Sequence, residues 1–373
     1  MTQQSRQFSR LQEIPRFGRR PPTPNLASFI IAEGDRRQWM NQTPRSSRLP
    51  CVPGPAAEPP QTSPLLAVFW GPNGLRAGWR LLIFFAILAT LSGIEILISR
   101  AMGQRHPSES RFTAQGLGWW MTHTKARVFI LLLIASWIMA RIEGRRVAEY
   151  GLPLQRAFRG GVWLGAAIGF AAITALLGAM HVIGMFSFGT IGLHGVQIWK
   201  YAVLSGVVFL FGGLFEELFF RGYIQFTLTT GIGFWPAAML TSTLFGYVHY
   251  SNSGETLVGT FSAGAAGFLF CLLLRRTGDL WMPIGFHAAW NWGETYFYGV
   301  PNSGGVASGH LFNASFSGPQ WLTGGTVGPE GSWLCVLLIA TLYVLFAIWL
   351  REAKYPDPSA LHTTGSHPMP LKA

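Results

Sequence analysis

Long apolar stretches, separated by short polar segments, recur along most of this chain of 373 residues. An apolar stretch of about 20 residues is long enough for a helix to cross a hydrocarbon layer of roughly 30 Å. About eight stretches of this kind occur, at Trp79–Ser99, Ala126–Ile142, Gly160–His181, Tyr201–Phe226, Phe234–His249, Thr256–Leu274, Leu280–Phe297 and Ser332–Arg351. The pattern therefore predicts an all-α fold, a polytopic membrane bundle of about eight transmembrane helices.

The segments between and around these stretches predict a division of the chain into six parts. The first is a basic, Pro/Arg-rich cytoplasmic arm, which we expect to be disordered because it has no sustained apolar period. In chain order the parts are this arm (1–64), N-terminal transmembrane helices (65–200), core helices (201–297), a Gly/Ser-rich external loop (298–331), a last transmembrane helix (332–351) and a tail (352–373).

Composition excludes an ordinary soluble domain, since 49% of the residues are hydrophobic and only 12% are charged. The formal net charge of +12 fits retained cytoplasmic segments and contact with anionic membrane lipids, and we expect no nucleic-acid partner. Cys51, Cys271 and Cys335 lie far apart, so neither a disulfide framework nor a zinc knuckle is expected. The oligomeric state is unknown from the sequence.

Arginine and lysine are concentrated in alternate connections between the stretches. The arm, the loop at 141–159 and the ends of the sixth and eighth stretches are rich in them, whereas the connections after the third, fifth and seventh stretches are nearly free of them. The positive-inside rule then predicts an integral protein of the cell membrane with both termini in the cytoplasm. Arg100, Arg105 and Arg111, after the first stretch, depart from this pattern.

Small residues recur at helical spacing in the third and sixth stretches. Such residues let two helix backbones approach closely, so they indicate helix packing and not chemistry. They are Gly161, Gly165 and Gly169 in the third stretch and Gly259, Ala263 and Gly267 in the sixth.

Ionisable residues inside these apolar stretches are the candidate functional residues. A charge near the bilayer centre costs roughly 2.5 to 3.5 kcal/mol on insertion scales, so such residues face a protein interior and tend to be functional. Glu217 and Arg221 are four residues apart on one helix and can pair, which leaves Glu216 free to take a proton from water. The alternative is a structural ion-pair network formed by all three.

Two further polar positions follow in the next apolar stretches. His249 lies four residues after Phe245, and Asn291 lies four residues after His287, so each pair shares one helix face. A histidine and an asparagine can coordinate a metal or donate hydrogen bonds to a developing oxyanion. A membrane histidine can equally be an interhelical hydrogen-bonding residue with no catalytic role.

Helix geometry allows these residues to meet. If the fourth and fifth stretches form a hairpin that turns near Gly231, Glu216 and His249 both lie roughly 22 to 27 Å along their helices. From a turn near Asp279 on the same side of the membrane, His287 and Asn291 lie roughly 12 and 18 Å in. Tilted helices can converge within the membrane over such differences.

The three clusters together resemble a known family, the CAAX proteases and bacteriocin-processing proteins, also called the CPBP, type II CAAX prenyl endopeptidase-like or Abi family. Its signature is Glu-Glu-x-x-x-Arg, then Phe-x-x-x-His, then His-x-x-x-Asn or Asp. The chain carries these motifs in this order, and the resemblance covers roughly Val203 to Phe297. The matching residues are Glu216, Glu217 and Arg221, then Phe245 and His249, then His287 and Asn291.

The resemblance implies an intramembrane endopeptidase that acts on a membrane-associated protein or peptide, lipidated or not. Glu216 would activate a water, His249 would assist, and His287 with Asn291 would stabilise the oxyanion. Glu217 and Arg221 would support the helix and orient the base.

The resemblance also raises the question of a metal. The family is labelled as metalloproteases, and Glu216, His249 and His287 would supply three zinc ligands with one position open. The chain has no His-Glu-x-x-His pair, so a glutamate-activated water without zinc stays an equal alternative.

Two rival functions use the same residues. A non-catalytic immunity or assembly protein of this family would keep the polar bundle as a scaffold, although it would not need both imidazoles and Asn291. A proton-coupled transporter also uses buried carboxylates and histidines, but it predicts an internal repeat, and residues 79–200 show no comparable half.

Overall fold

The computed structural model describes residues 68–71, 74–103, 117–252 and 254–357. The chain divides into two units after Gln61, and all described residues belong to the second unit, Thr62–Ala373. The predicted arm at residues 1–64 and the tail from residue 358 onward lie outside the described residues.

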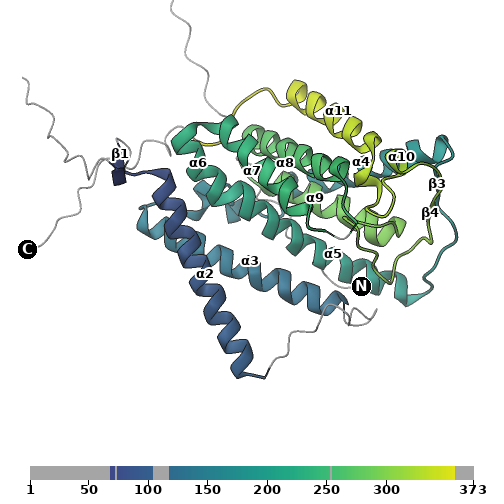
Figure 1. Ribbon diagram of the computed structural model, residues 1–373, viewed down its shortest axis with the longest axis horizontal. Helices are drawn as coiled ribbons and strands as arrows, with labels where there is room; N and C mark the ends of the chain where they lie inside the picture. The colour runs from purple at the N-terminus through teal and green to yellow at the C-terminus, as the bar shows by residue number, and fades with distance from the viewer. Residues whose placement is uncertain (1–67, 72–73, 104–116, 253, 358–373) are drawn as a thin grey trace, which may run out of the picture. The chain divides into compact units, whose positions relative to one another are not determined.

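The described residues are mainly helical, and each of the eight predicted stretches corresponds to one helix or to consecutive helices (Figure 1). The helices are α2 (Ala77–Ala101), α3 (Leu117–Ile142), α4 (Gly160–Val182), α5 (Val196–Glu217), the π-helix η5 (Leu218–Tyr223), α6 (Ile224–Ile232), α7 (Phe234–His249), α8 (Leu257–Thr277), α9 (Trp281–Trp292), the π-helix η6 (Gly293–Tyr298) and α11 (Trp333–Trp349).

Short elements complete the described part of the chain. They are the strand pair β1 (Trp70–Gly71) and β2 (Gly74–Leu75), the strand pair β3 (Phe186–Ser187) and β4 (Ser315–Phe316), the 3-10 helices η3 (Val147–Tyr150), η4 (Leu154–Arg156) and η7 (Pro329–Gly331), and the one-turn helix α10 (Gln320–Thr323). Both strand pairs are antiparallel.

The predicted fold class, an all-α polytopic membrane bundle, is confirmed. Within the described residues, four helices are long and apolar enough to cross a membrane by themselves: α2, α4, the continuous helix Val196–Ile232 and α8. The helices α7 and α9 are shorter, with 16 and 12 residues, and α11 is a shorter apolar helix. Helix length and apolar character alone therefore identify four membrane spans, which is fewer than the eight helical segments among the described residues.

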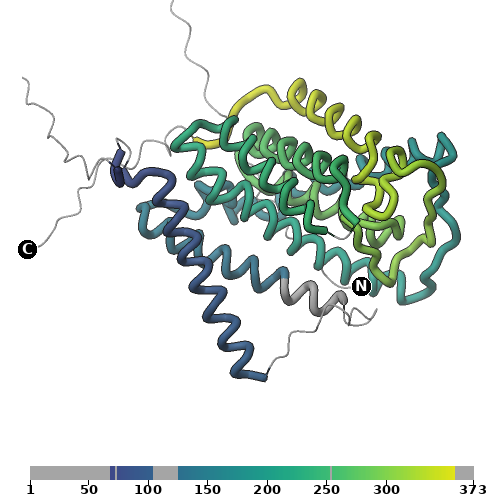
Figure 2. The backbone as a smooth tube through the Cα atoms, viewed as in Figure 1, coloured from purple at the N-terminus to yellow at the C-terminus, as the bar shows by residue number. Residues whose placement is uncertain are grey.

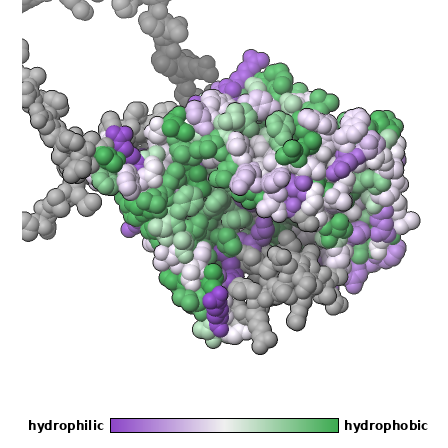
Figure 3. Space-filling view, viewed as in Figure 1, coloured by the Kyte–Doolittle hydropathy of each residue, from purple (hydrophilic) through white to green (hydrophobic). Residues whose placement is uncertain are grey.

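Large apolar side chains face outward along α2, as expected of a helix in contact with lipid. Leu82, Phe85 and Leu97 are 57%, 42% and 65% exposed. Only 6% of the most apolar window of this helix is buried inside the protein. Figure 3 shows apolar side chains gathered over the region of α2.

Connections that are far apart in the sequence contact each other at the two ends of the bundle. At one end β3, in the connection after α4, pairs with β4 in the loop after η6. At the other end, the backbone N–H of Leu280 donates to the Gly151 carbonyl, and that of Lys354 donates to the Arg275 carbonyl. Which end faces the cytoplasm stays a prediction.

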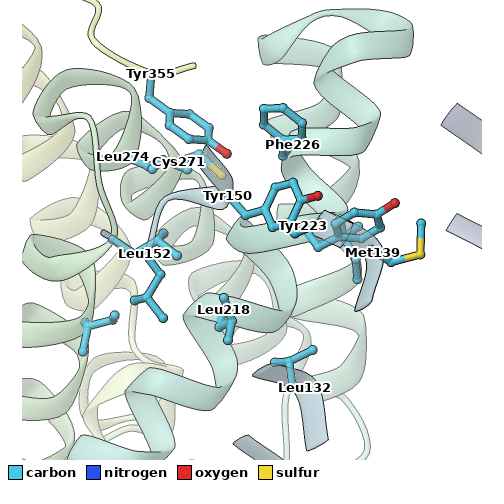
Figure 4. Packing of buried hydrophobic residues seen from close by; sticks show 14 of the residues in the cluster. Leu132, Met139, Tyr150, Leu152, Leu218, Tyr223, Phe226, Cys271, Leu274 and Tyr355 are labelled. Carbon is cyan, nitrogen blue, oxygen red and sulfur yellow. The ribbon is translucent and has the colours of Figure 1, made fainter. Parts of the chain in front are cut away.

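A buried cluster at this second end ties α2, η3 and η5 together (Figure 4). The ring of Tyr223 stacks on Phe84 at 4.6 Å and meets Tyr150 edge-on at 5.0 Å. Arg80 and the Tyr223 hydroxyl both donate to the carboxylate of Glu143, and the Arg80–Glu143 contact measures 2.6 Å. The cluster thus anchors the helix turn that immediately follows Glu217.

The helices α4 and α9 pack with their backbones almost in contact. A Cβ atom built on Gly169 would lie 2.3 Å from the Phe286 carbonyl oxygen, and one on Gly285 would lie 2.0 Å from the Val162 carbonyl oxygen. The small residues predicted to allow close approach therefore do so in α4. This contact sets the position of α9 and therefore of His287. A side chain larger than hydrogen at these glycines would push the two helices apart.

We expect Gly169→Ala to lower the free energy of unfolding by about 1 to 3 kcal/mol, because the added methyl group collides with backbone and not with a movable side chain. The matched control is Gly178→Ala in the same helix, where an added Cβ meets nothing within 4 Å. The control should be neutral or slightly stabilising. The thermal unfolding midpoints of both variants in detergent check this, and equal midpoints would contradict it.

Candidate active site

The helix that carries the two glutamates changes its winding directly after them. The α-helix α5 ends at Glu217, and the π-helix η5 follows, with a non-helical backbone at Gly222. A π-turn inside a longer helix is often found at functional sites. Here the wider turn carries Arg221, and a Cβ on Gly222 would lie 2.8 Å from the Leu218 side chain.

The carboxylate of Glu217 accepts hydrogen bonds from two side chains. Its Oε1 accepts hydrogen bonds from Arg221 Nη1 at 3.2 Å and from His287 Nδ1 at 2.9 Å. Glu217 and Arg221 have fully buried side chains, and that of His287 is 9% exposed. The predicted pairing of Glu217 with Arg221 is confirmed, but the pair contacts His287 and so orients the imidazole, whereas the sequence suggested that it orients Glu216.

Arg221 is enclosed by aromatic rings. Its guanidinium lies 4.3 Å from the centroid of the Phe245 ring, which gives a cation-π contact in a desolvated place. A Cβ on Gly267 would lie 2.3 Å from Arg221 Nη2, so the absence of a side chain there makes room for the guanidinium. The Nε and Nη2 atoms of Arg221 have no hydrogen-bond partner among the described residues. The small-residue stripe of α8, predicted to serve helix packing, thus also accommodates a polar group.

Glu216 points the other way and meets two different groups. Its Oε1 accepts a hydrogen bond from Lys125 Nζ at 2.9 Å, and its Oε2 lies 3.6 Å from His287 Nε2. Its side chain is 18% exposed. The predicted meeting of Glu216 with an imidazole is therefore confirmed for His287.

Lys125 was not among the residues that the sequence indicated. It belongs to α3, which lies beside α5 along the backbone path in Figure 2. The expected span began at Ala126, one residue later, and the helix begins earlier, at Leu117. A lone lysine near the start of an apolar stretch is typical of a residue at the membrane surface, and its partner is 91 positions away in sequence.

The second histidine and the asparagine line the same cavity as Glu216 and His287. His249 Nδ1–H donates to the Phe245 carbonyl oxygen at 2.8 Å, and its ring lies 4.4 Å from the Phe245 ring. This bond requires a proton on Nδ1, so Nε2 is the ring nitrogen that stays available for other contacts. His249 also lies within electrostatic range of the Glu216 carboxylate. All four predicted catalytic residues therefore face one space.

The cavity has a volume of about 640 Å³ and extends beyond these residues. The loop after η6, which the resemblance does not cover and from which no role was inferred, supplies Asn302, Ser303 and Glu330 to its lining. Glu294 was likewise not among the residues that the sequence indicated, and it is 0% exposed. Contacts between a loop and a distant helix leave no periodic signal in a sequence.

The three predicted zinc ligands do not form a ligand set in this arrangement. Within the described ranges, no group of three or more His, Cys, Asp or Glu side chains is placed to hold a metal ion. One oxygen of Glu216 is already bound to a cation, Lys125. The arrangement therefore fits a carboxylate that acts on water more closely than it fits a zinc centre.

Comparison with known proteins gives the same family as the three motifs. Residues 197–293 match the family described as Type II CAAX prenyl endopeptidase Rce1-like. Over 89 residues the chain is 34% identical to the Bacillus subtilis (strain 168) protein named Putative membrane peptidase YdiL. This similarity covers 24% of the chain and 33% of the relative, so the chain spans a third of the length of the curated relative it matches. No solved structure matches the chain. Residues 197–293 are therefore similar to the CAAX prenyl endopeptidase family, and this similarity covers about a quarter of the chain.

The buried trio of Glu217, Arg221 and His287 makes a prediction about stability. Arg221→Met removes the main counter-charge of a fully buried carboxylate and should lower the free energy of unfolding by about 3 to 5 kcal/mol. The double variant Glu217→Gln with Arg221→Met leaves no uncompensated charge and should be more stable than Arg221→Met alone. Chemical unfolding in detergent measures the free energies of unfolding of the two single variants and of the double variant. Strictly additive losses of stability would contradict a shared buried pair.

Proposed function

We propose that this protein is an intramembrane endopeptidase that hydrolyses a peptide bond of a membrane-associated protein or peptide. The observation that carries the proposal is the opposition of the Glu216 carboxylate and the His287 imidazole across 3.6 Å at the wall of a cavity. The similarity of residues 197–293 to the Type II CAAX prenyl endopeptidase family supports peptide hydrolysis as the chemistry.

Glu216 is the proposed general base. A water hydrogen-bonded to its Oε2 would give up a proton to the carboxylate while the water oxygen forms a bond to the peptide carbonyl carbon. The proton would then pass from Glu216 to the amide nitrogen as the carbon–nitrogen bond breaks. Lys125, bound to Oε1, holds the carboxylate in one orientation so that Oε2 faces the cavity.

His287, as an imidazolium that donates from Nδ1 to Glu217 and from Nε2 into the cavity, is proposed to stabilise with Asn291 the oxyanion that forms on the carbonyl oxygen. They lie one helical turn apart in α9 and line the cavity together. Preorganised donors of this kind contribute about 2.7 to 4 kcal/mol each to transition-state stabilisation in other hydrolases. The bond from His287 Nδ1–H to Glu217 keeps the ring from turning, which is the preorganisation that the role requires. His249, on the neighbouring helix α7, would assist the proton transfer.

The lining of the cavity supports a membrane-associated substrate. Most of its inner surface is formed by apolar side chains, among them Phe209, Phe219 and Ile339. Such walls favour an apolar peptide segment or an acyl or prenyl chain over a charged soluble peptide. A lipidated substrate is therefore included in the proposal.

We expect Glu216→Gln to reduce peptide cleavage by about 10² to 10⁴-fold, because the amide cannot accept the proton from water. The assay incubates purified protein with a membrane proteome and identifies new C-termini by mass spectrometry. His249→Ala should also reduce cleavage. Glu352→Gln, at a side chain that is 84% exposed, is the matched control and should cleave like the unaltered protein.

An unaltered protein and a Glu216→Gln variant that produce the same set of new C-termini would overturn the enzyme proposal. A protein that yields no cleavage above background in any form would instead favour the non-catalytic scaffold of the same family.

Removal of metal provides a separate prediction. Since the described residues do not gather three ligands, cleavage should persist after treatment with a chelator. The measurement is the same proteome assay with and without the chelator. Loss of cleavage that added Zn²⁺ restores would mean that the site rearranges to bind zinc, contrary to this prediction.

A further inference from the structure

The cavity has a second polar end, separate in composition from the end that holds the two histidines. Glu255, in the connection before α8, and Glu330, in η7, line it together with Asn302 and Ser303. Glu330 is held by neutral donors: its Oε1 accepts from Trp290 Nε1 at 3.2 Å, and its Oε2 accepts from the Ser303 backbone N–H and hydroxyl at 3.1 and 2.9 Å. These bonds fix the carboxylate in place but leave its charge uncompensated.

A third carboxyl group lies behind this wall. Glu294 is 0% exposed, and neither of its oxygen atoms has a hydrogen-bond partner among the described residues. It lies four residues after Trp290, and it is close enough to Glu330 for the two carboxyl groups to interact electrostatically. A polar group buried without a partner costs about 1 to 3 kcal/mol, and more when it is charged, so such groups in a folded protein call for a reason. Asn302 Nδ2, in the cavity wall, is also buried without a partner in this part of the chain.

No lysine or arginine forms an ion pair with these carboxyl groups in the part of the chain that the structure describes. None of the ion pairs there involves Glu255, Glu294 or Glu330. Burial raises the pKa of the Glu255 carboxyl, and the nearby Glu330 acts in the same direction, whereas the Thr256 backbone N–H and His249 act in the opposite direction. A ligand cation would relieve the repulsion between these carboxyl groups.

The kind of cation follows from the arrangement of the acids. A metal ion needs several ligand atoms within about 2.0 to 2.6 Å, and no three acidic or other ligating side chains among the described residues are grouped in that way. A guanidinium or ammonium group on an alkyl stem spreads its donors over a wider space. The apolar wall formed by Ala263, Ile339 and the Trp290 ring can accept the stem.

We propose that the acidic end of the cavity, formed by Glu255 and Glu330, is a subsite for a basic side chain, lysine or arginine, of the bound substrate. The proposal rests on the proposed function, since both ends belong to one cavity. A peptide whose scissile bond lies at Glu216 would place a basic residue at the acidic end, at a fixed number of residues from the cut.

A binding comparison tests the subsite without requiring catalysis. Benzamidine carries a cationic amidinium on an apolar ring, and benzamide is its neutral counterpart of the same shape. Benzamidine should raise the thermal unfolding midpoint of the purified full chain in a dose-dependent way, and benzamide should not. Glu330→Gln and, separately, Glu255→Gln should weaken benzamidine binding about tenfold, whereas Glu352→Gln should leave it unchanged.

Equal binding of the two compounds, or benzamidine binding that both cavity variants leave intact, would overturn the subsite. Two variants are used because one of them could fail to fold, which size-exclusion chromatography would detect as loss of the monodisperse peak. The other variant then still tests the subsite.

Cleavage of the membrane proteome provides the second arm. Cut sites of the unaltered protein should be enriched in lysine or arginine at one fixed distance from the new C-terminus, and the cut sites that Glu330→Gln still produces should lack this enrichment. Cleavage without the enrichment would refute the subsite but not the protease. Absence of cleavage would refute the protease, and the benzamidine comparison would then decide the subsite alone.

Discussion

A single buried carboxylate, that of Glu217, is the contact on which the arrangement of the site depends. It is fully buried, and it accepts hydrogen bonds from both Arg221 and His287. A charge removed from water costs several kcal/mol, and this cost is recovered only if partners with good geometry surround it. Both bonds are made to Oε1, whereas Oε2 has no hydrogen-bond partner among the described residues. The bond from His287 to Oε1 determines the direction in which the His287 ring faces.

The rest of the core makes this contact possible. Close backbone packing of α4 against α9, through Gly169 and Gly285, sets the position of the helix that carries His287. The π-turn η5 sets the position of Arg221, and the space left by Gly267 accepts its guanidinium. Helix packing, local winding and side-chain size thus act together to hold one hydrogen-bonded trio inside a membrane bundle.

Much of this could be predicted from the sequence, because the information is periodic or local. Apolar stretches predicted the helices, and the spacing of four residues predicted that Glu217 and Arg221 pair. Helix arithmetic and the order of the motifs indicated that Glu216 could meet an imidazole, as it does at His287. The small residues in α4 were identified correctly as positions of close backbone approach, whereas Gly267 in α8 makes room for the Arg221 guanidinium.

The remaining features depend on contacts between distant segments. Lys125 binds Glu216 across 91 positions, and Glu330 reaches the cavity from a loop that has no periodic pattern. The burial of Glu294 could not be predicted either, since its place after a short helix resembles an interfacial position until the loop that covers it is known. The count of membrane spans was also harder to predict than the fold class, because α7 and α9 are short.

The most direct test of the central claim is the protonation and hydrogen bonding of the His287 ring. Among the nine histidines of the chain, His287 can be assigned by its loss in a His287→Gln variant. Nitrogen-15 NMR of histidine-labelled protein in lipid bilayers should show a protonated, strongly hydrogen-bonded Nδ1 on a rigid ring. An unprotonated Nδ1, or a ring that rotates freely, would contradict the claim that Glu217 holds this imidazole toward Glu216.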